Sequence, residues 1–206
     1  SSSLVVMDES YSLHASFVHR PESKQTLVIK SNPVFGGSTS GAGAYNEGDL
    51  VNIMAEAQPG YVFAGWTGSI VSDPSNQSAT ILIDQHHVVE ANFLPIDYQL
   101  TTRVVGQGQV LGGGEYPFGT LVNLTALPET GYRFVGWSDL GNGFLIDQNI
   151  TYKITENTVF EAQFEPESYT LAIHSSSGGL VYGAGEYVYG SMVGIEAHPA
   201  TGFSFI

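Results

Sequence analysis

Short segments with alternating apolar and polar residues run along most of the chain. Within residues 51–57 and 89–93 every second residue is apolar, and most of the residues between are polar. A period of two places successive side chains on opposite faces of a β-strand. No segment keeps an apolar stripe at helical spacing over three turns, although the loops 67–78 and 138–149 leave room for one short helical turn. The pattern therefore predicts a chain built mainly of short strands.

The strand pattern repeats along the sequence. Gly48–Ala55 recurs as Gly119–Ala126 and again as Gly190–Ala197, so that equivalent glycines stand 71 residues apart. Two further segments keep the same step, namely 60–66 with 131–137 and 89–93 with 160–164. Self-similarity at one fixed period over several segments is the signature of a repeat protein.

The closing segment of each copy sets the expected boundaries. Leu13–Phe17 has the pattern of a closing segment, so we expect residues 1–20 to be the last strand of a preceding repeat. Two complete repeats then occupy residues 21–95 and 96–166, and residues 167–206 form the N-terminal half of a third.

Each complete repeat is expected to hold about six short strands. Hairpin turns at 84–87 and 155–158 are predicted to join the fifth strand to the sixth. Matching positions in the first and last strands carry opposite charges, which predicts cross-strand ion pairs if those strands are neighbours. The pairs are Lys30–Glu90 and Arg103–Glu161.

The joints between copies contain proline. Pro21, Pro95 and Pro166 each stand shortly after the last phenylalanine of a copy. Short joints of this kind are extended and stiff. A unit of about 70 residues has a thin core and gains stability from its neighbours. We therefore expect contacts between neighbouring repeats of the chain and an elongated, semi-rigid array.

Three motifs resemble those of a known family. The V-x-L-x-A run of Gly119–Ala126, the G-Y-x-F-x-G-W run of Gly131–Trp137 and the closing A-x-F of Phe160–Phe164 are similar to the divergent internalin-B-type repeat, also called the Listeria–Bacteroides repeat. The resemblance implies a mainly β unit, β-grasp-like or a small antiparallel sheet. It also implies tandem arrays in bacterial cell-surface or secreted proteins, where they serve as stalks or adhesive modules, and it supplies no catalytic residues.

Composition and charge exclude several classes of function. The chain has 20 Asp and Glu against 6 Lys and Arg, a net charge of −14 at pH 7, and such a surface repels nucleic acids and anionic lipids. It has no cysteine, which excludes disulfides, thiolate zinc sites and cysteine nucleophiles. No window is apolar enough for a spanning helix, so we expect neither nucleic-acid binding nor membrane insertion.

Aromatic residues recur at matching positions of the copies. Trp66 and Trp137 each follow a glycine at the same position of the repeat, and we interpret them as core residues. The alternative is an aromatic platform for a sugar or peptide. Tyr45, Tyr116 and Tyr187 follow segments with two or three glycines, at 41–43, 112–114 and 183–185. Those glycines predict turns or bulges with unusual backbone angles, and they lack the Lys and Ser/Thr of a phosphate loop.

The histidines do not recur at the spacing of metal ligands. His86 and His87 are adjacent in a turn, and His14 and His174 replace residues of other types in the other copies. We therefore expect no designed metal site.

One loop offers oxygen ligands. Asp139, Asn142 and Asp147 lie close together in sequence and could bind calcium weakly, although a turn rich in such residues is the favoured interpretation. No serine, histidine and acid recur together, and no pair of carboxylates stands out, so no catalytic or cofactor-binding residue is assigned.

These features together predict a non-catalytic structural or adhesive repeat region of a bacterial cell-surface or secreted protein, acting as a stalk or a filament-building module. The alternatives are a module that binds a surface glycan or protein, and an accessory region of a large secreted enzyme. We also expect head-to-tail assembly, in which the N-terminal segment of one molecule packs on the half-repeat of the next. The apolar face expected to receive that segment carries Val193, Ile195, Phe203 and Phe205.

Overall fold

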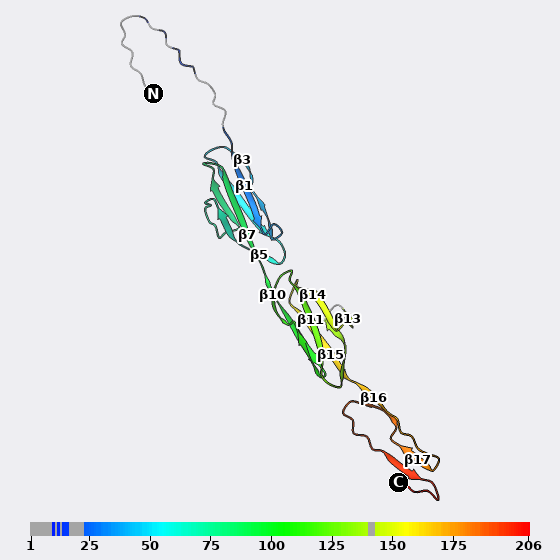
Figure 1. The fold of residues 1–206 in the computed structure, drawn as a ribbon. Coiled ribbons are helices and arrows are strands. Elements are labelled where there is room, and N and C mark those ends of the chain that lie inside the picture. The colour runs from blue at the N-terminus through cyan, green and yellow to red at the C-terminus, as the bar shows by residue number, and fades with distance from the viewer. Residues whose placement is uncertain (1–9, 11, 13, 17–22, 140–142) are drawn as a thin grey trace. The chain divides into compact units, whose positions relative to one another are not determined.

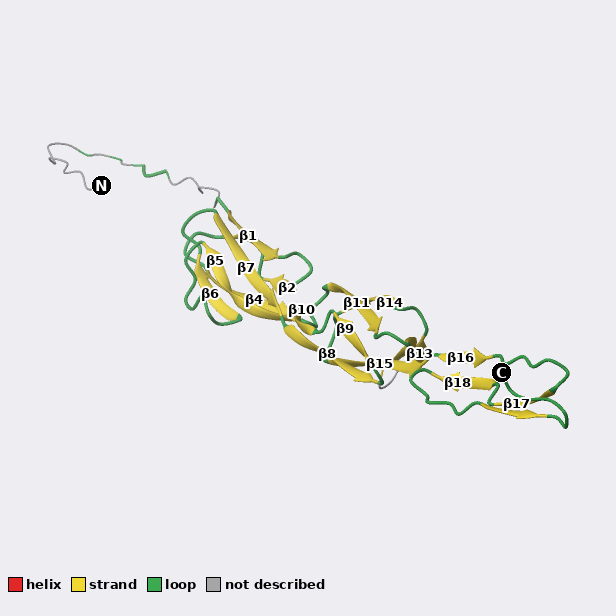
Figure 2. Cartoon of the chain, turned by 60° about the horizontal axis from the view of Figure 1, so that its bottom comes forward, coloured by secondary structure: helices red, strands yellow, loops and turns green. Residues whose placement is uncertain are grey.

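The computed structural model describes residues 10, 12, 14–16, 23–139 and 143–206. Within them the chain forms nineteen strands and no helix (Figures 1 and 2), as the alternating pattern predicts. The closing strand predicted at Leu13–Phe17 lies partly outside the described residues. The chain divides into two compact units, Ser1–Glu56 with Phe63–Asn92 and Ala57–Val62 with Phe93–Ile206.

The first complete repeat consists of two small sheets. One has the strand order β3-β1-β7-β5 and the other β2-β4-β6. The strands are β1 (Gln25–Asn32), β2 (Gly37–Ser40), β3 (Gly43–Tyr45), β4 (Leu50–Ala57), β5 (Tyr61–Gly68), β6 (Ser78–Leu82) and β7 (His87–Pro95). The first and last strands, β1 and β7, lie side by side and parallel, in register from Leu27 with His87 to Asn32 with Asn92.

The second complete repeat has the same plan. Its sheets have the orders β10-β8-β15-β12-β13 and β14-β11-β9. The strands are β8 (Asp97–Val105), β9 (Gly108–Leu111), β10 (Gly114–Pro117), β11 (Leu121–Pro128), β12 (Tyr132–Asp139), β13 (Gly143–Leu145), β14 (Asn149–Lys153) and β15 (Thr158–Pro166). Again the first and last strands, β8 and β15, form a parallel pair.

The third copy holds two pairs of antiparallel strands. β16 (Ser168–Leu171) pairs with β18 (Gly185–Val188), and β17 (Gly179–Tyr182) pairs with β19 (Glu196–Pro199). The β16–β18 pair corresponds to β8 with β10, because Tyr169 faces Tyr187 as Tyr98 faces Tyr116.

The pairing of strands corrects one prediction. The turns 84–87 and 155–158 are not hairpins, because β6 pairs with β4 whereas β7 pairs with β1, and β14 and β15 are separated in the same way. The period of two had identified each strand and its buried face, but it does not say which strand is the partner. Each complete repeat thus contains one sheet with a parallel centre, and in the second repeat the other sheet, β14-β11-β9, is antiparallel, so a repeat is not a single small antiparallel sheet.

The core of each complete repeat lies between its two sheets. In β4 the side chains of Val51, Ile53 and Ala55 are buried while those between are exposed, as the alternation predicts. The core of the second repeat consists of Leu100, Val122, Leu124, Ala126, Trp137, Ile154, Phe160, Ala162 and Phe164. These residues come from both sheets, so burial of apolar surface holds the two layers together.

The predicted cross-strand ion pairs do not form. Lys30 is in register with Glu90, and Arg103 with Glu161, so the strands are neighbours as the prediction required. The ion pairs of the described residues are instead His87–Asp84, Arg133–Glu165 and His198–Glu196. Glu90 accepts a hydrogen bond from the amide of Asn32 at 3.1 Å. An exposed ion pair contributes little free energy of stabilisation, so the side-chain amide of Asn32 competes effectively with Lys30 for Glu90.

Candidate functional site

The two tryptophans are core residues. Trp66 is 4% exposed and Trp137 is fully buried. Each indole Nε1 donates a hydrogen bond to a loop carbonyl ten residues later, to Asn76 at 2.9 Å and to Asp147 at 3.0 Å. The packing role predicted for both residues is confirmed, and an aromatic platform at these two positions is excluded, because a ligand cannot reach their rings.

Each recurring tyrosine closes a glycine turn of its own copy. The hydroxyls of Tyr45, Tyr116 and Tyr187 donate to the carbonyl oxygens of the glycines four residues earlier, at 2.8, 3.1 and 3.0 Å. Those glycines, Gly41, Gly112 and Gly183, have φ angles of +103°, +105° and +105°. The unusual backbone angles predicted there are confirmed.

His87 is buried, which sequence reasoning missed. Its Nε2 lies 2.8 Å from Oδ1 of Asp84, and its Nδ1 is buried without a hydrogen-bond partner. The sequence contains a signal for this burial: His87 stands two residues before Val89 and four before Ala91, so the alternation of the strand places it on the same buried face. His86 remains exposed in the turn, and the described part of the chain contains no group of three or more acidic or histidine side chains able to hold a metal ion.

The calcium candidate stays a prediction. Asn142 and the side chain of Asp139 lie outside the described residues, and the backbone carbonyl of Asp147 accepts the Trp137 hydrogen bond. The corresponding loop of the first repeat is closed by Asp73, whose Oδ1 accepts hydrogen bonds from the hydroxyl and the backbone amide of Ser75, at 2.7 and 3.0 Å. These bonds hold the pKa of the Asp73 carboxyl below its usual value.

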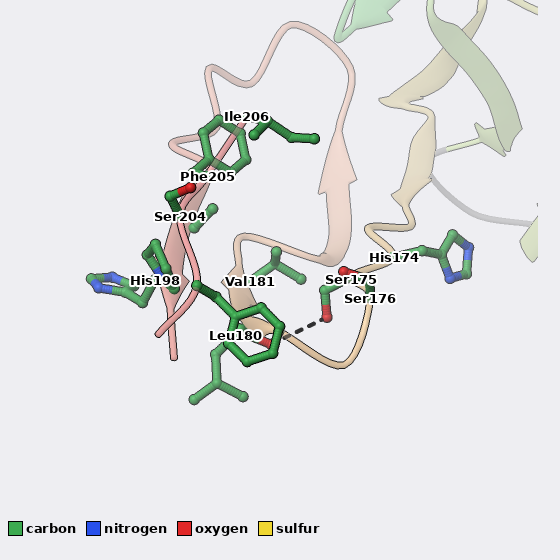
Figure 3. Close-up of a pocket in the computed structure, with 14 residues that line it drawn as sticks. His174, Ser175, Ser176, Leu180, Val181, His198, Ser204, Phe205 and Ile206 are labelled. Carbon is green, nitrogen blue, oxygen red and sulfur yellow. Dashed lines mark hydrogen bonds between the residues drawn. The ribbon is translucent and has the colours of Figure 1, made fainter. Parts of the chain in front are cut away.

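A cavity of about 270 Å³ opens on the third copy (Figure 3). Leu180, Val181 and Phe205 line it, and His174 and His198 lie on opposite sides of it. In the second repeat the corresponding position is closed: Ala126 is fully buried, whereas its counterpart Ala197, which lines the cavity, is exposed.

The apolar part of the cavity thus corresponds to core positions of a complete repeat, and its lining also includes the polar side chains of His174, Ser175 and His198. Phe203 and Phe205, which belong to the face predicted to receive a head-to-tail contact, line the cavity and are exposed. That contact stays a prediction, because most of the donating segment lies outside the described residues.

Comparison with known proteins identifies the repeat. A family model described as the divergent InlB B-repeat domain matches the chain three times, over residues 27–97, 98–168 and 169–206. The chain belongs to this family. Comparison with curated proteins and with solved structures gave no match. InlB-type repeats are associated with bacterial surface proteins, and the chain is a region of three such repeats in tandem. Among its described residues, no helix is long and apolar enough to cross a membrane.

Proposed function

We propose that this InlB B-repeat region is a non-catalytic spacer of a bacterial surface protein, which acts as a semi-rigid stalk. The supporting observation is that the recurring polar side chains make their hydrogen bonds within their own copy. The indole of Trp137 bonds its own loop, and the hydroxyl of Tyr116 bonds its own turn. Their counterparts Trp66 and Tyr45 do the same in the first repeat. What recurs from copy to copy is thus needed by the fold of each copy, as a series of equal spacers requires.

The charge of the chain supports the same role. A net charge of −14 keeps extended arrays soluble and makes neighbouring arrays repel one another. A bound glycan, in contrast, would need exposed aromatic rings beside polar groups, and the recurring tryptophans are not available for that purpose.

Small-angle X-ray scattering tests the stalk role. The natural chain is compared with variants in which residues 96–166 are deleted or duplicated. The nine-residue strand β8 spans about 30 Å, so each added repeat is expected to lengthen the maximum dimension by roughly that amount. A maximum dimension that hardly changes between the three chains would show that the repeats collapse on one another, and the stalk role would be wrong.

A further inference from the structure

Consecutive repeats are joined by a short series of backbone hydrogen bonds that occurs twice. The amide of Glu167 donates to the carbonyl of Gly131 at 2.8 Å, and the amide of Tyr189 donates to the carbonyl of Glu167 at 2.7 Å. The joint thus connects the turn before β12, the linker before β16 and the residue after β18. The same two bonds, each 2.8 Å long, link Gly60, Ile96 and Phe118, all 71 residues earlier. Both sets lie inside the second compact unit.

At each joint an aromatic ring covers a glycine. A Cβ atom built on Gly131 would stand 2.2 Å from Cγ of Tyr189, and one built on Gly60 would stand 2.4 Å from Cγ of Phe118. Both glycines have positive φ angles, +78° and +85°. Glycine is therefore needed twice over, for the left-handed backbone and for the space that the ring fills.

Two further aromatic residues flank each ring. Tyr132, next to the glycine, contacts Tyr189 edge-on with ring centroids 6.3 Å apart, and Tyr169 of the following copy lies 6.5 Å from Tyr189. At the earlier joint, Phe118 lies 5.7 Å from the ring of Tyr61 and 6.4 Å from that of Tyr98. Edge-on and tilted ring pairs at these distances attract one another beyond the area they bury.

The third copy contains the same turn without a ring. Gly202 corresponds to Gly131 and has a φ angle of +85°, yet nothing lies within 4 Å of a Cβ atom built on it. The left-handed glycine is thus a property of the turn itself and does not require the ring.

The first repeat contains neither of the aromatic residues that its successors bring to the joint. Glu47, which is exposed, stands directly before Gly48 as Phe118 stands before Gly119. Gln25 faces Tyr45 across β1 and β3 as Tyr98 faces Tyr116 across β8 and β10. Both polar replacements fall at the positions that form the joint in the later copies, while the residues of the core keep their apolar character.

From these observations we propose that the aromatic side chain at positions 118 and 189 is a plug that fits the Gly-Tyr turn of the preceding repeat, and that the first repeat lacks this plug. The partner that the plug fits is a turn of the same repeat family. Glu47 and Gln25 would place a carboxylate and an amide against an apolar aromatic contact, so the first repeat cannot seat on such a turn in the same way. The inference concerns recognition between repeats and does not depend on the stalk role.

Proton NMR of the full chain tests the proposal. A ring that covers a glycine shields its Hα protons, so the Hα resonances of Gly60 and Gly131 are expected upfield of those of Gly202, whose turn is open. Phe118→Glu, which copies the residue of the first repeat, is expected to return the Gly60 resonances to the Gly202 position and to leave Gly131 unchanged. Tyr189→Glu is expected to have the opposite selectivity.

A pair of glycine variants separates the ring from the backbone. Gly131→Ala and Gly202→Ala strain the backbone alike, but only the former places a methyl group where a ring lies. We expect the nuclear Overhauser contacts between Tyr132 and Tyr189 to vanish in Gly131→Ala and to persist in Gly202→Ala. The shifted indole signal of buried Trp137 verifies in every variant that the second repeat is folded. Unshifted Gly60 and Gly131 resonances in the natural chain, or shifts that survive both Glu variants, would overturn the proposal. Neither outcome would bear on the scattering test of the stalk role.

Discussion

Replacing Trp137 by phenylalanine tests whether the tryptophans serve the core. The indole is fully buried and contacts the rings of Phe134 and Phe160 edge-on, at 5.6 and 6.3 Å. The change removes the hydrogen bond to the carbonyl of Asp147, worth about 1 kcal/mol. It also removes apolar volume, and at about 0.8 kcal/mol per carbon-sized group the smaller ring loses about 2 kcal/mol more. The free energy of unfolding should therefore fall by about 3 kcal/mol.

Urea denaturation provides the assay. With a slope of about 1–1.5 kcal/mol per molar urea for a unit of this size, the midpoint of the second repeat should fall by about 2–3 M. The chain has two tryptophans, one in each complete repeat, so Trp137→Phe leaves Trp66 fluorescence as a reporter of the first repeat. Circular dichroism reports the loss of strands from both.

The matched variant Trp66→Phe exchanges the roles of the two repeats, because Trp66 makes the equivalent bond at 2.9 Å. A midpoint unchanged by either substitution would refute the assignment of these residues to the core. The assignment would also be refuted if acrylamide quenched the Trp66 emission of the folded Trp137→Phe variant as strongly as that of the same variant unfolded in urea.

Three further predictions concern turns. Tyr116→Phe removes the bond to the Gly112 carbonyl and should lower the free energy of unfolding by about 0.5–1.5 kcal/mol in urea denaturation; no change would mean that water replaces the hydroxyl without loss. Gly68→Ala should lower the melting temperature more than Gly48→Ala. The two glycines have matching φ angles of +96° and +95°, but only a Cβ atom on Gly68 meets an obstacle, the Val88 carbonyl oxygen at 2.4 Å. Equal melting temperatures of the two variants would contradict the clash. The Asp73 carboxyl has a pKa lowered from 3.8 by the hydrogen bonds of Ser75, so its contribution to stability is present above pH 3.8 and is lost as the pH falls through the lowered value. Asp73→Ala should therefore be less stable than the natural chain at pH 7, and this difference should become smaller as the pH falls below 3.8. A difference as large at pH 2 as at pH 7 would contradict this origin.

The sequence predicted which residues lie inside, but not which strands are neighbours. A period of two fixes the face on which Val51 and Ile53 lie, and the recurrence of Trp137 indicates a need common to every copy. The partner of a strand depends on non-local contacts, which is why the turns 84–87 and 155–158 were interpreted as hairpins although they connect two layers. The same limit applies to Lys30 and Glu90, because the sequence predicts their ion pair only if their strands are neighbours. The strands are neighbours, but Glu90 accepts a hydrogen bond from the side-chain amide of Asn32 instead.

The joint illustrates a second limit of sequence reasoning. Phe118 and Tyr189 recur at the same spacing as the tryptophans, so their importance could have been suspected from the sequence alone. Their partners, Gly60 and Gly131, stand 58 residues earlier, and the step between ring and glycine is not part of any local pattern. Only the folded backbone brings the two together, through the bonds of Ile96 and Glu167.

The parallel pairing of the first and last strands of a repeat has a consequence for force. When a surface protein is pulled, tension enters a repeat at the start of β1 and leaves at the end of β7. Because the two strands run in the same direction and are in register over six residue pairs, these points lie at opposite ends of the ladder. The load then acts along the strands, and the evenly spaced bonds between them must yield together in shear instead of opening one by one. β8 and β15 repeat this arrangement in the next copy, so each complete repeat places a ladder that is loaded in shear directly in the line of tension.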